Sequence, residues 1–138
     1  MKAKKIGLVI LITLIIGGFF LNKLYNKPHI NINNVKADIT LTANKIFTDF
    51  SSDEILANKL YLDQIIQVKG TVSKIELENN KGIVTLQTKD DFGSVLCYLA
   101  DNFSINIKDV KIGQELSLKG ICTGFLMDVV LVKCIIIN

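Results

Sequence analysis

The order of apolar and polar positions divides the chain into four regions. Residues 6–21 are apolar apart from Thr13 and three glycines, and a stretch with the only proline and four asparagines follows. Apolar residues then recur with a spacing near 3.6 up to residue 61, which is typical of helices. From residue 65 onward they alternate with polar residues, which is typical of strands. The pattern therefore predicts two short helices followed by a set of strands.

The first helix is expected to start after residue 39, with Thr40 as its cap. Its inward face is predicted to comprise Leu41, Ala43, Ile46, Phe47 and Phe50. The sequence S-S-D-E at residues 51–54 fits a capping box, so a second helix is expected from residue 53 to about residue 61. Its inward side chains are predicted to be Ile55, Leu56, Leu60 and Tyr61.

The first strand, residues 65–77, contains a phase change. Its inward positions are expected to be Ile66, Val68, Gly70 and Val72. The next apolar residues, Ile75 and Leu77, fall on the opposite phase, which indicates a β-bulge near Ser73 and Lys74. Strands at residues 83–88 and 94–100 follow turns at 78–82 and 89–93. Residues 101–111 are expected to form a loop with one helical turn.

The last two strands, residues 114–124 and 128–137, are expected to form a hairpin. The inward sets are Leu116, Leu118, Gly120 and Cys122 on one strand and Val130, Val132, Cys134 and Ile136 on the other, because Lys133 must face water. The simplest pairing that matches inward positions sets Gly124 opposite Asp128 across a loop of Phe125, Leu126 and Met127. It also sets Cys122 opposite Val130 and Cys134 opposite Leu118.

Five strands, of which the first is long, bulged and interrupted by a glycine, predict a mainly β fold. We expect a five-stranded OB-type Greek-key barrel, preceded by the two helices. A five-stranded open sheet is the alternative.

The N-terminal apolar run predicts a membrane anchor. A helix over residues 6–25 would be about 30 Å long, which matches the hydrocarbon core of a bilayer. Lys2, Lys4 and Lys5 precede it and favour an N-terminus inside the cell. The predicted order is a basic cytoplasmic flank (1–5), a transmembrane anchor (6–25), a linker (26–38) and an OB-fold domain (39–138). A cleaved signal peptide and a buried core helix are the alternatives.

The charge distribution changes the meaning of the net charge of +3. Four of the 16 lysines lie in the first 23 residues, and from residue 26 onward 12 lysines face 13 acidic residues. The domain itself is therefore nearly neutral, unlike a nucleic-acid-binding surface.

Three segments carry a family resemblance. They are A-N-K-L-Y-L-D-Q-I-I-Q-V-K-G-T-V (57–72), V-L-C-Y (95–98) and K-G-I-C-T-G-F-L-M-D-V-V-L-V-K-C (119–134). From about residue 41 to the C-terminus the chain resembles the tRNA_anti-like family of bacterial OB-fold proteins, which are typically membrane-anchored or lipoprotein-like. The resemblance implies a fold and a location, and its name implies kinship with anticodon-binding domains.

Nucleic-acid binding by such a barrel would use the outer face of its first three strands. On this chain that face is expected to present Lys69, Thr71, Thr85, Gln87 and Tyr98. One cation and one ring are too few, because each stacked base contributes only about 1–3 kcal/mol. We therefore expect nucleic acid not to be the ligand. The apolar loop of Phe125, Leu126 and Met127 is a second candidate contact, although it could instead fold over the barrel end and close the core.

Catalysis is not expected. The only histidine, His29, lies in the linker, so neither a Ser-His nor a Cys-His pair can form in the domain. No nucleophile-elbow, P-loop or zinc-protease motif occurs, and neither a metal site nor a cofactor is predicted.

The three cysteines are all expected to face inward. In the predicted hairpin Cys122 and Cys134 are offset by four residues, about 13 Å, which is too far for a disulfide. Cys97 could pair with Cys122 or Cys134, and three buried reduced thiols are the equal alternative.

The sequence thus favours a non-catalytic binding module at a bacterial inner membrane. The chain would cross once through residues 6–25 and expose its C-terminal domain to the periplasm or the exterior. Its ligand would be a protein, a peptide or an envelope component. The alternative is weak binding of single-stranded nucleic acid or oligosaccharide by the OB face.

Overall fold

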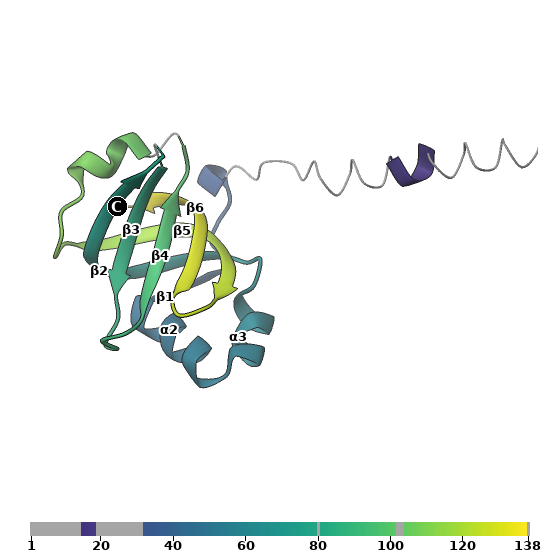
Figure 1. Cartoon of the computed structure of the whole chain (residues 1–138), viewed down its shortest axis with the longest axis horizontal. Coiled ribbons are helices and arrows are strands. Elements are labelled where there is room, and N and C mark those ends of the chain that lie inside the picture. Colours follow the sequence, from purple (N-terminus) through teal and green to yellow (C-terminus); the bar gives the residue numbers. More distant parts are fainter. Residues whose placement is uncertain (1–14, 19–31, 80, 102–103, 138) are drawn as a thin grey trace, which may run out of the picture. The chain divides into compact units, whose positions relative to one another are not determined.

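The computed structural model describes residues 15–18, 32–79, 81–101 and 104–137 (Figure 1). The chain divides into two compact units, residues 1–30 and residues 31–138. Most of the predicted anchor, residues 6–25, lies outside the described residues; within it, residues 15–18 are helical and exposed. No helix in the described ranges is long and apolar enough to cross a membrane.

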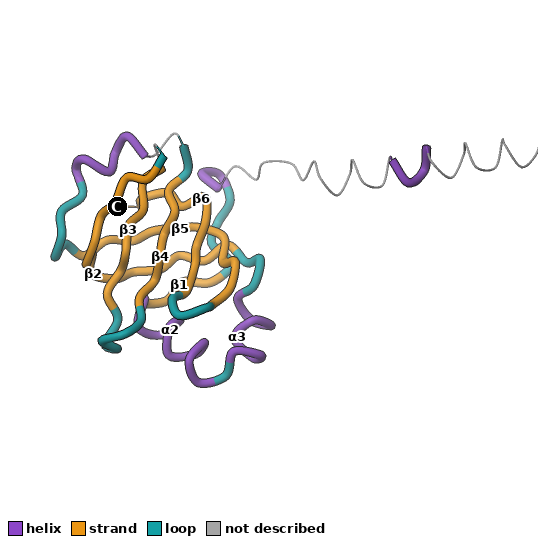
Figure 2. The backbone as a smooth tube through the Cα atoms, in the orientation of Figure 1, coloured by secondary structure: helices purple, strands orange, loops and turns teal. Residues whose placement is uncertain are grey.

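Six strands build the second unit (Figures 1 and 2). They are β1 (Ile39–Thr42), β2 (Ile65–Glu78), β3 (Lys81–Gln87), β4 (Ser94–Leu99), β5 (Glu115–Phe125) and β6 (Val129–Ile137). The sheet order is β1-β2-β3-β4-β6-β5, and β2 also pairs with β5. That pairing closes β2 to β6 into a five-stranded barrel, so the predicted OB-type barrel is confirmed and the open sheet is excluded.

The predicted β-bulge in β2 is present. Val72 pairs with Leu86 and Lys74 with Thr85, so Ser73 is the extra residue. Alternation before the bulge buries Ile66 and Val68 as expected, and the inward positions of β3 and β4 are also buried as expected. A six-residue 3-10 helix, η2 (Ser104–Asp109), provides the helical turn expected between the third and fourth barrel strands.

The start of the first helix was predicted wrongly. Residues 39–42 form β1, which lies parallel to the first half of β2, and α2 (Ala43–Ser52) begins only afterwards. Thr42, rather than Thr40, is the N-cap, because its side chain accepts a hydrogen bond from the backbone N–H of Lys45. The I-T-L-T sequence alternates with period two, and this short strand signal outweighs the helical spacing of Leu41.

The second helix, α3 (Glu54–Tyr61), lies where it was predicted, but the predicted capping box is wrong, because Ser51 and Ser52 still belong to α2 and the Ser51 hydroxyl donates to the Thr48 carbonyl. Asp53 caps it through a hydrogen bond from the Leu56 N–H, while only Ala57 and Tyr61 are buried. Ile55, Leu56 and Leu60 were expected to point inward and are exposed instead. A helix of eight residues that rests on α2 and one end of the barrel has only a narrow contact face, so most of its apolar residues stay in water.

The register of the β5–β6 hairpin also differs from the prediction. Phe125 pairs with Val129 and Cys122 with Leu131, and the register shifts twice along the pair. Val129 and Leu131 are therefore buried in place of Val130 and Val132. Lys133 is exposed as expected, but its φ of +54° marks the local irregularity that restores Cys134 to the core. Two irregularities within one hairpin cannot be read from alternation.

The end of the predicted linker is attached to the barrel. Residues 32–38, here called the strap, include the 3-10 helix η1 (Ile32–Asn34). Ile32 is buried against Ile65 and Ile135 on the outside of the sheet. The Nζ of the buried Lys119 donates to the Val35 carbonyl at 2.7 Å, and an Asp38 carboxylate oxygen accepts from the Ile65 N–H at 3.0 Å. Only the part of the linker before residue 32 is outside the described residues.

The main core fills the barrel and the space beneath α2. Ile46 and Phe50 are fully buried there, and Gly70 allows the close approach, because an added Cβ would lie 2.9 Å from the Ala43 Cβ. Cys97, Cys122 and Cys134 are buried free thiols. Burial and a hydrogen bond with Cys97 raise the pKa of Cys134 well above its usual value. The two are thus neighbours, and a disulfide at Cys97 stays a prediction.

Candidate binding groove

A groove of about 560 Å³ lies on the outer face of the barrel. It is lined by the bulge of β2, the outer face of β3, the β3–β4 turn (residues 88–93) and the segment before β5. Its lining residues are Thr71, Val72, Ser73, Lys74, Thr85, Gln87, Thr88, Asp90, Asp91, Phe92, Gly93, Ser94, Ile112, Gly113 and Asp128. Most of these residues carry hydroxyl, amide, ammonium or carboxylate groups, and polar and apolar atoms contribute about equally to the groove surface.

The bulge forms the floor of the groove. The hydroxyl of Ser73, the extra residue, donates to the Thr85 carbonyl at 3.3 Å. Thr85 is only 8% exposed yet lines the groove. Its backbone pairs within the sheet, and no hydrogen bond between described residues uses its hydroxyl. No buried side-chain polar atom of the described residues lacks a partner, so this hydroxyl is open to solvent in the groove, where a ligand can bond it in place of water.

The β3–β4 turn holds an aromatic ring at the rim. Thr88 ties the turn together, because its hydroxyl donates to the Gly93 carbonyl at 2.5 Å. An Asp90 carboxylate oxygen accepts from the Phe92 N–H at 2.9 Å. Phe92 consequently projects outward and is 89% exposed. Gly93 is required beneath it, since an added Cβ would overlap the Phe47 ring of α2.

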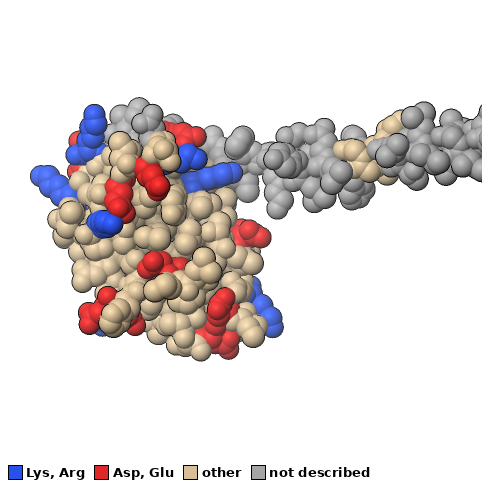
Figure 3. All heavy atoms as spheres, viewed as in Figure 1, with Lys and Arg blue, Asp and Glu red and all other residues tan. Residues whose placement is uncertain are grey.

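The charge of the groove is negative. Asp128 forms one wall, where its Oδ1 accepts from the Ser94 N–H at 2.7 Å and from the Ser94 hydroxyl at 2.6 Å. Asp90 and Asp91 contribute two further carboxylates, against a single lysine, Lys74, which pairs with Glu76 at 2.8 Å. Figure 3 shows carboxylates at the lower left of the folded unit, where the β3–β4 turn lies in Figure 1. A phosphate backbone would therefore be repelled here.

The structure places three of the five predicted face residues in the groove and two outside it. Thr71, Thr85 and Gln87 lie together in the groove. Lys69 instead forms an ion pair with Glu115 at 3.0 Å, and Tyr98, which pairs with Ile83, does not line the groove. The acidic and aromatic lining was missed, although D-D-F in a turn directly after a predicted strand was a visible signal.

The three residues of the predicted hairpin loop also differ in their exposure. Phe125 turns inward and lies on the rings of Phe47 and Phe50, with centroids 5.8 Å and 5.6 Å away. It therefore closes the barrel end, and only the other two residues form an exposed tip: Leu126 is 91% and Met127 72% exposed. A second pocket of about 470 Å³ lies between this hairpin and α3.

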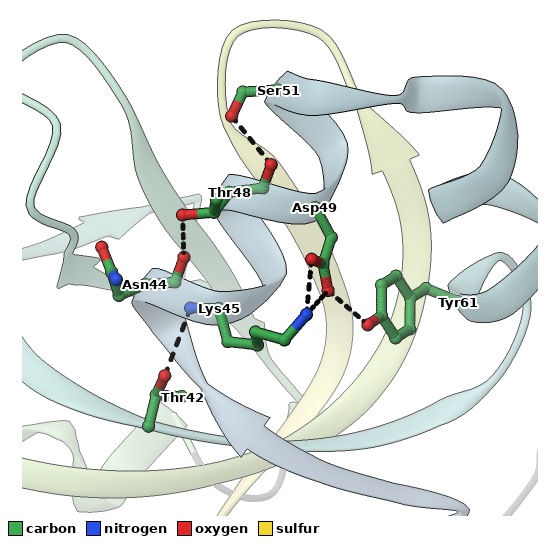
Figure 4. A network of polar contacts seen from close by, with 7 residues as sticks. All are labelled: Thr42, Asn44, Lys45, Thr48, Asp49, Ser51 and Tyr61. Carbon is green, nitrogen blue, oxygen red and sulfur yellow. Dashed lines mark hydrogen bonds and ion pairs between the residues drawn. The ribbon is translucent and has the colours of Figure 1, made fainter.

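A polar network holds the two helices together at the same end (Figure 4). Asp49 of α2 binds the Lys45 ammonium at 2.5 Å and accepts from the Tyr61 hydroxyl of α3 at 2.7 Å. Burial would raise the pKa of Asp49, but the hydrogen bonds from Lys45 and Tyr61 lower it overall. Burial and the hydrogen bond to Asp49 raise the pKa of Tyr61 to about 12. This network is structural, because its carboxylate is fully engaged.

No group of three or more potential metal ligands occurs within residues 32–79, 81–101 and 104–137 or the short N-terminal helix.

Comparisons with known proteins identify related sequences and folds. A family model described as tRNA_anti-like matches residues 1–136. A solved protein of Klebsiella pneumoniae subsp. pneumoniae MGH 78578, described as a "putative nucleic acid-binding lipoprotein", is 14% identical with a TM-score of 0.62; the match covers 81% of this chain and 100% of that one. The OBody AM3L09, bound to hen egg-white lysozyme, is 14% identical with a TM-score of 0.45, over 57% of this chain and 86% of that one. No curated protein matches.

Proposed function

The chain belongs to the tRNA_anti-like family, and from this premise we propose that its folded unit is a non-catalytic binding module. Its ligand is a protein, a peptide or another envelope component, held in the groove beside the β3–β4 turn. The observation that carries the proposal is the combination in one groove of an unpaired threonine hydroxyl, an exposed ring and an excess of carboxylates. Such a surface offers hydrogen bonds and contact area and disfavours polyanions.

The proposal includes a location outside the cytoplasm. The apolar run at residues 6–21 is long enough for an anchor, and the lysines before it favour an N-terminus inside. The same run would serve as a cleaved signal, which would also export the domain. Digestion of spheroplasts with an external protease tests the location: we expect the domain to be degraded, and protection before lysis would overturn it.

A site-specific crosslinker tests the binding function in cells. Phe92 is replaced by a photoreactive phenylalanine analogue in the full chain, and the control carries the analogue at Leu77, another exposed apolar position, which does not line the groove. We expect a defined adduct from position 92 and none from position 77. Equal labelling at both positions, or no adduct at either, would contradict a binding groove.

Nucleic acid is the second candidate ligand, because the family name points to anticodon-binding domains and the Klebsiella relative carries a nucleic-acid-binding description. A salt titration of the full chain with a single-stranded oligonucleotide separates the candidates. Each phosphate contact contributes about −0.7 to the slope of log K against log salt. We expect weak binding with a shallow slope. Tight, salt-steep binding would favour the nucleic-acid function over the proposed one.

A further inference from the structure

One end of the folded unit combines exposed apolar side chains with negative charge. This end, here called the acidic end, consists of α2 and α3 with their caps, the β3–β4 turn and the β5–β6 loop (residues 126–128). Hydrogen bonds join its parts, because the Lys89 N–H donates to the Asn44 side chain and Ser94 donates to Asp128. The elements accordingly lie together, opposite η2, in Figure 1.

Charge is distributed unequally between this end and the rest of the unit. The acidic end carries six Asp and Glu residues against three Lys, a net charge of −3, whereas the remaining residues from 32 to 137 carry seven against eight, a net charge of +1. Figure 3 shows these carboxylates on both sides of the acidic end. A partner's basic side chains would therefore be attracted to this end over the rest of the unit.

Exposed apolar side chains are concentrated at the same end. Of ten large hydrophobic residues that are exposed among the described residues from 32 onward, seven belong to it: Ile55, Leu56, Leu60, Leu62, Phe92, Leu126 and Met127. A group of this size on a small domain is typical of an interaction surface. Its acidic surroundings argue against a bilayer as the occupant, because anionic headgroups would be repelled.

The groove gives this surface directional contacts. Asp90 and Asp128 each use one carboxylate oxygen for the protein's own hydrogen bonds, through Phe92 and Ser94, which leaves their second oxygens for a ligand. The exposed Phe92 ring lines the same groove and can bind a cation on its face. Thr85, a mostly buried residue on the floor, adds a hydroxyl that is open to the groove.

We propose that the acidic end docks a basic, amphipathic peptide segment of a partner protein. The cationic side chains of that segment lie against Asp90, Asp91 and Asp128, and its apolar side chains lie against Phe92 and Leu126. This inference rests on the proposed binding function and specifies the chemistry of the partner.

Peptide titration of the full chain in non-ionic detergent tests the inference. The probes are a labelled decapeptide of alternating Lys and Leu and its counterpart of alternating Glu and Leu. We expect the Lys peptide to bind at least about tenfold more tightly, with an affinity that falls as salt rises. Equal affinity for the two peptides would overturn the inference.

A matched pair of variants locates the contact. Asp90→Asn with Asp91→Asn is compared with Asp101→Asn and Asp109→Asn, which removes the same charge at the opposite end. We expect the first double variant to weaken Lys-peptide binding about tenfold and the second to change it less than about twofold. Equal losses would mean that only net charge matters and would overturn the docking site.

Failure of this inference is distinguishable from failure of the proposed function. If the crosslinker at position 92 captures a defined partner through a neutral or acidic segment, the binding function stands and the inference falls. If it captures a basic segment, and Asp90→Asn with Asp91→Asn abolishes that adduct while the control pair does not, both are supported. If position 92 gives no adduct and an oligonucleotide binds tightly, both fall.

Discussion

β2 passes through two different surroundings on the outside of the barrel. At its start, Ile65 lies beneath the strap and packs against Ile32 and Ile135; farther along, Thr71 and Ser73 line the open groove. Burial of apolar area is favourable by about 25 cal/mol per Å², whereas burial of an unpaired hydroxyl is costly. The chain therefore covers the apolar stretch with its own strap and leaves the hydroxyl-bearing stretch to solvent or a partner.

Lys119 shows that polarity alone does not decide which surface is covered. It lies under the strap and is nearly buried, but its ammonium is hydrogen-bonded to the Val35 carbonyl. The Thr85 hydroxyl has no such partner among the described residues. The contrast is therefore between polar groups that the chain bonds itself and polar groups that it leaves open to solvent or a ligand.

The largest test of this contrast compares neighbours in the hairpin. Phe125→Ala removes a partly buried ring from the barrel end and should lower the free energy of unfolding by about 3 kcal/mol, the lower limit for a buried aromatic residue. Leu126→Ala, one residue later but exposed, should change it by less than about 0.5 kcal/mol. Urea unfolding measures both, and similar losses would show that the tip is also part of the core.

The next test removes the apolar side chain that anchors the strap to the barrel. Ile32→Ala should cost about 2 kcal/mol, near the lower limit for buried aliphatic residues, because its site is on the outer face. Hydrogen exchange at the Ile65 amide should accelerate, since that N–H is bonded to Asp38. Gln87→Ala in the open groove is the control and should affect neither quantity. An unchanged Ile65 amide would mean that the strap is held without Ile32.

A smaller effect is expected from the polar network of Lys45, Asp49 and Tyr61, which joins the two helices. Tyr61→Phe removes the hydrogen bond to Asp49 and should cost about 1 kcal/mol at neutral pH. Because the pKa of Asp49 is lowered, its contribution is present above about pH 4 and is lost as the pH falls through the lowered value. The pKa of Tyr61 is raised to about 12, so its contribution is lost as the pH rises from 10 towards 12.

Thermal unfolding across these two pH ranges measures how much the Asp49–Tyr61 hydrogen bond contributes to stability. The wild-type chain should lose stability at both extremes more steeply than Tyr61→Phe, which lacks one partner. Parallel curves for the two chains would show that the Asp49–Tyr61 contact contributes nothing that depends on protonation.

Local alternation was sufficient to predict the inward positions of β2, β3 and β4, but not the register of the β5–β6 hairpin or the face of α3. The phase change at Ser73 revealed the bulge because apolar residues flank it on both sides. At Lys133 the strand is apolar on both faces, so a second irregularity left no trace in the pattern. α3 was misjudged for a related reason: Ile55 and Leu56 look like core residues, and only tertiary packing shows that nothing covers them.

Only part of the groove lining could be predicted from the sequence. Thr71, Thr85 and Gln87 follow from strand alternation, because they occupy the outward phase. Asp128 could not be placed by alternation, since it reaches the groove through its bond to Ser94, 34 residues earlier in the chain. Contacts of this range depend on barrel closure, which brings the β5–β6 loop beside the β3–β4 turn.

The smallest expected effect on stability belongs to Thr85, which is compared with the equally buried Thr88. Thr85 and Thr88 are 8% and 7% exposed and both line the groove. The Thr88 hydroxyl bonds to the Gly93 carbonyl and accepts from the Asp90 N–H, so Thr88→Val should cost about 1–2 kcal/mol. The Thr85 hydroxyl has no partner among the described residues, so Thr85→Val should change the free energy of unfolding by less than about 0.5 kcal/mol. The same Thr85→Val substitution should weaken ligand binding, because the ligand then loses a hydrogen bond. A large loss of stability in Thr85→Val would instead show that this hydroxyl contributes to the fold. It would then no longer support a ligand site in the groove.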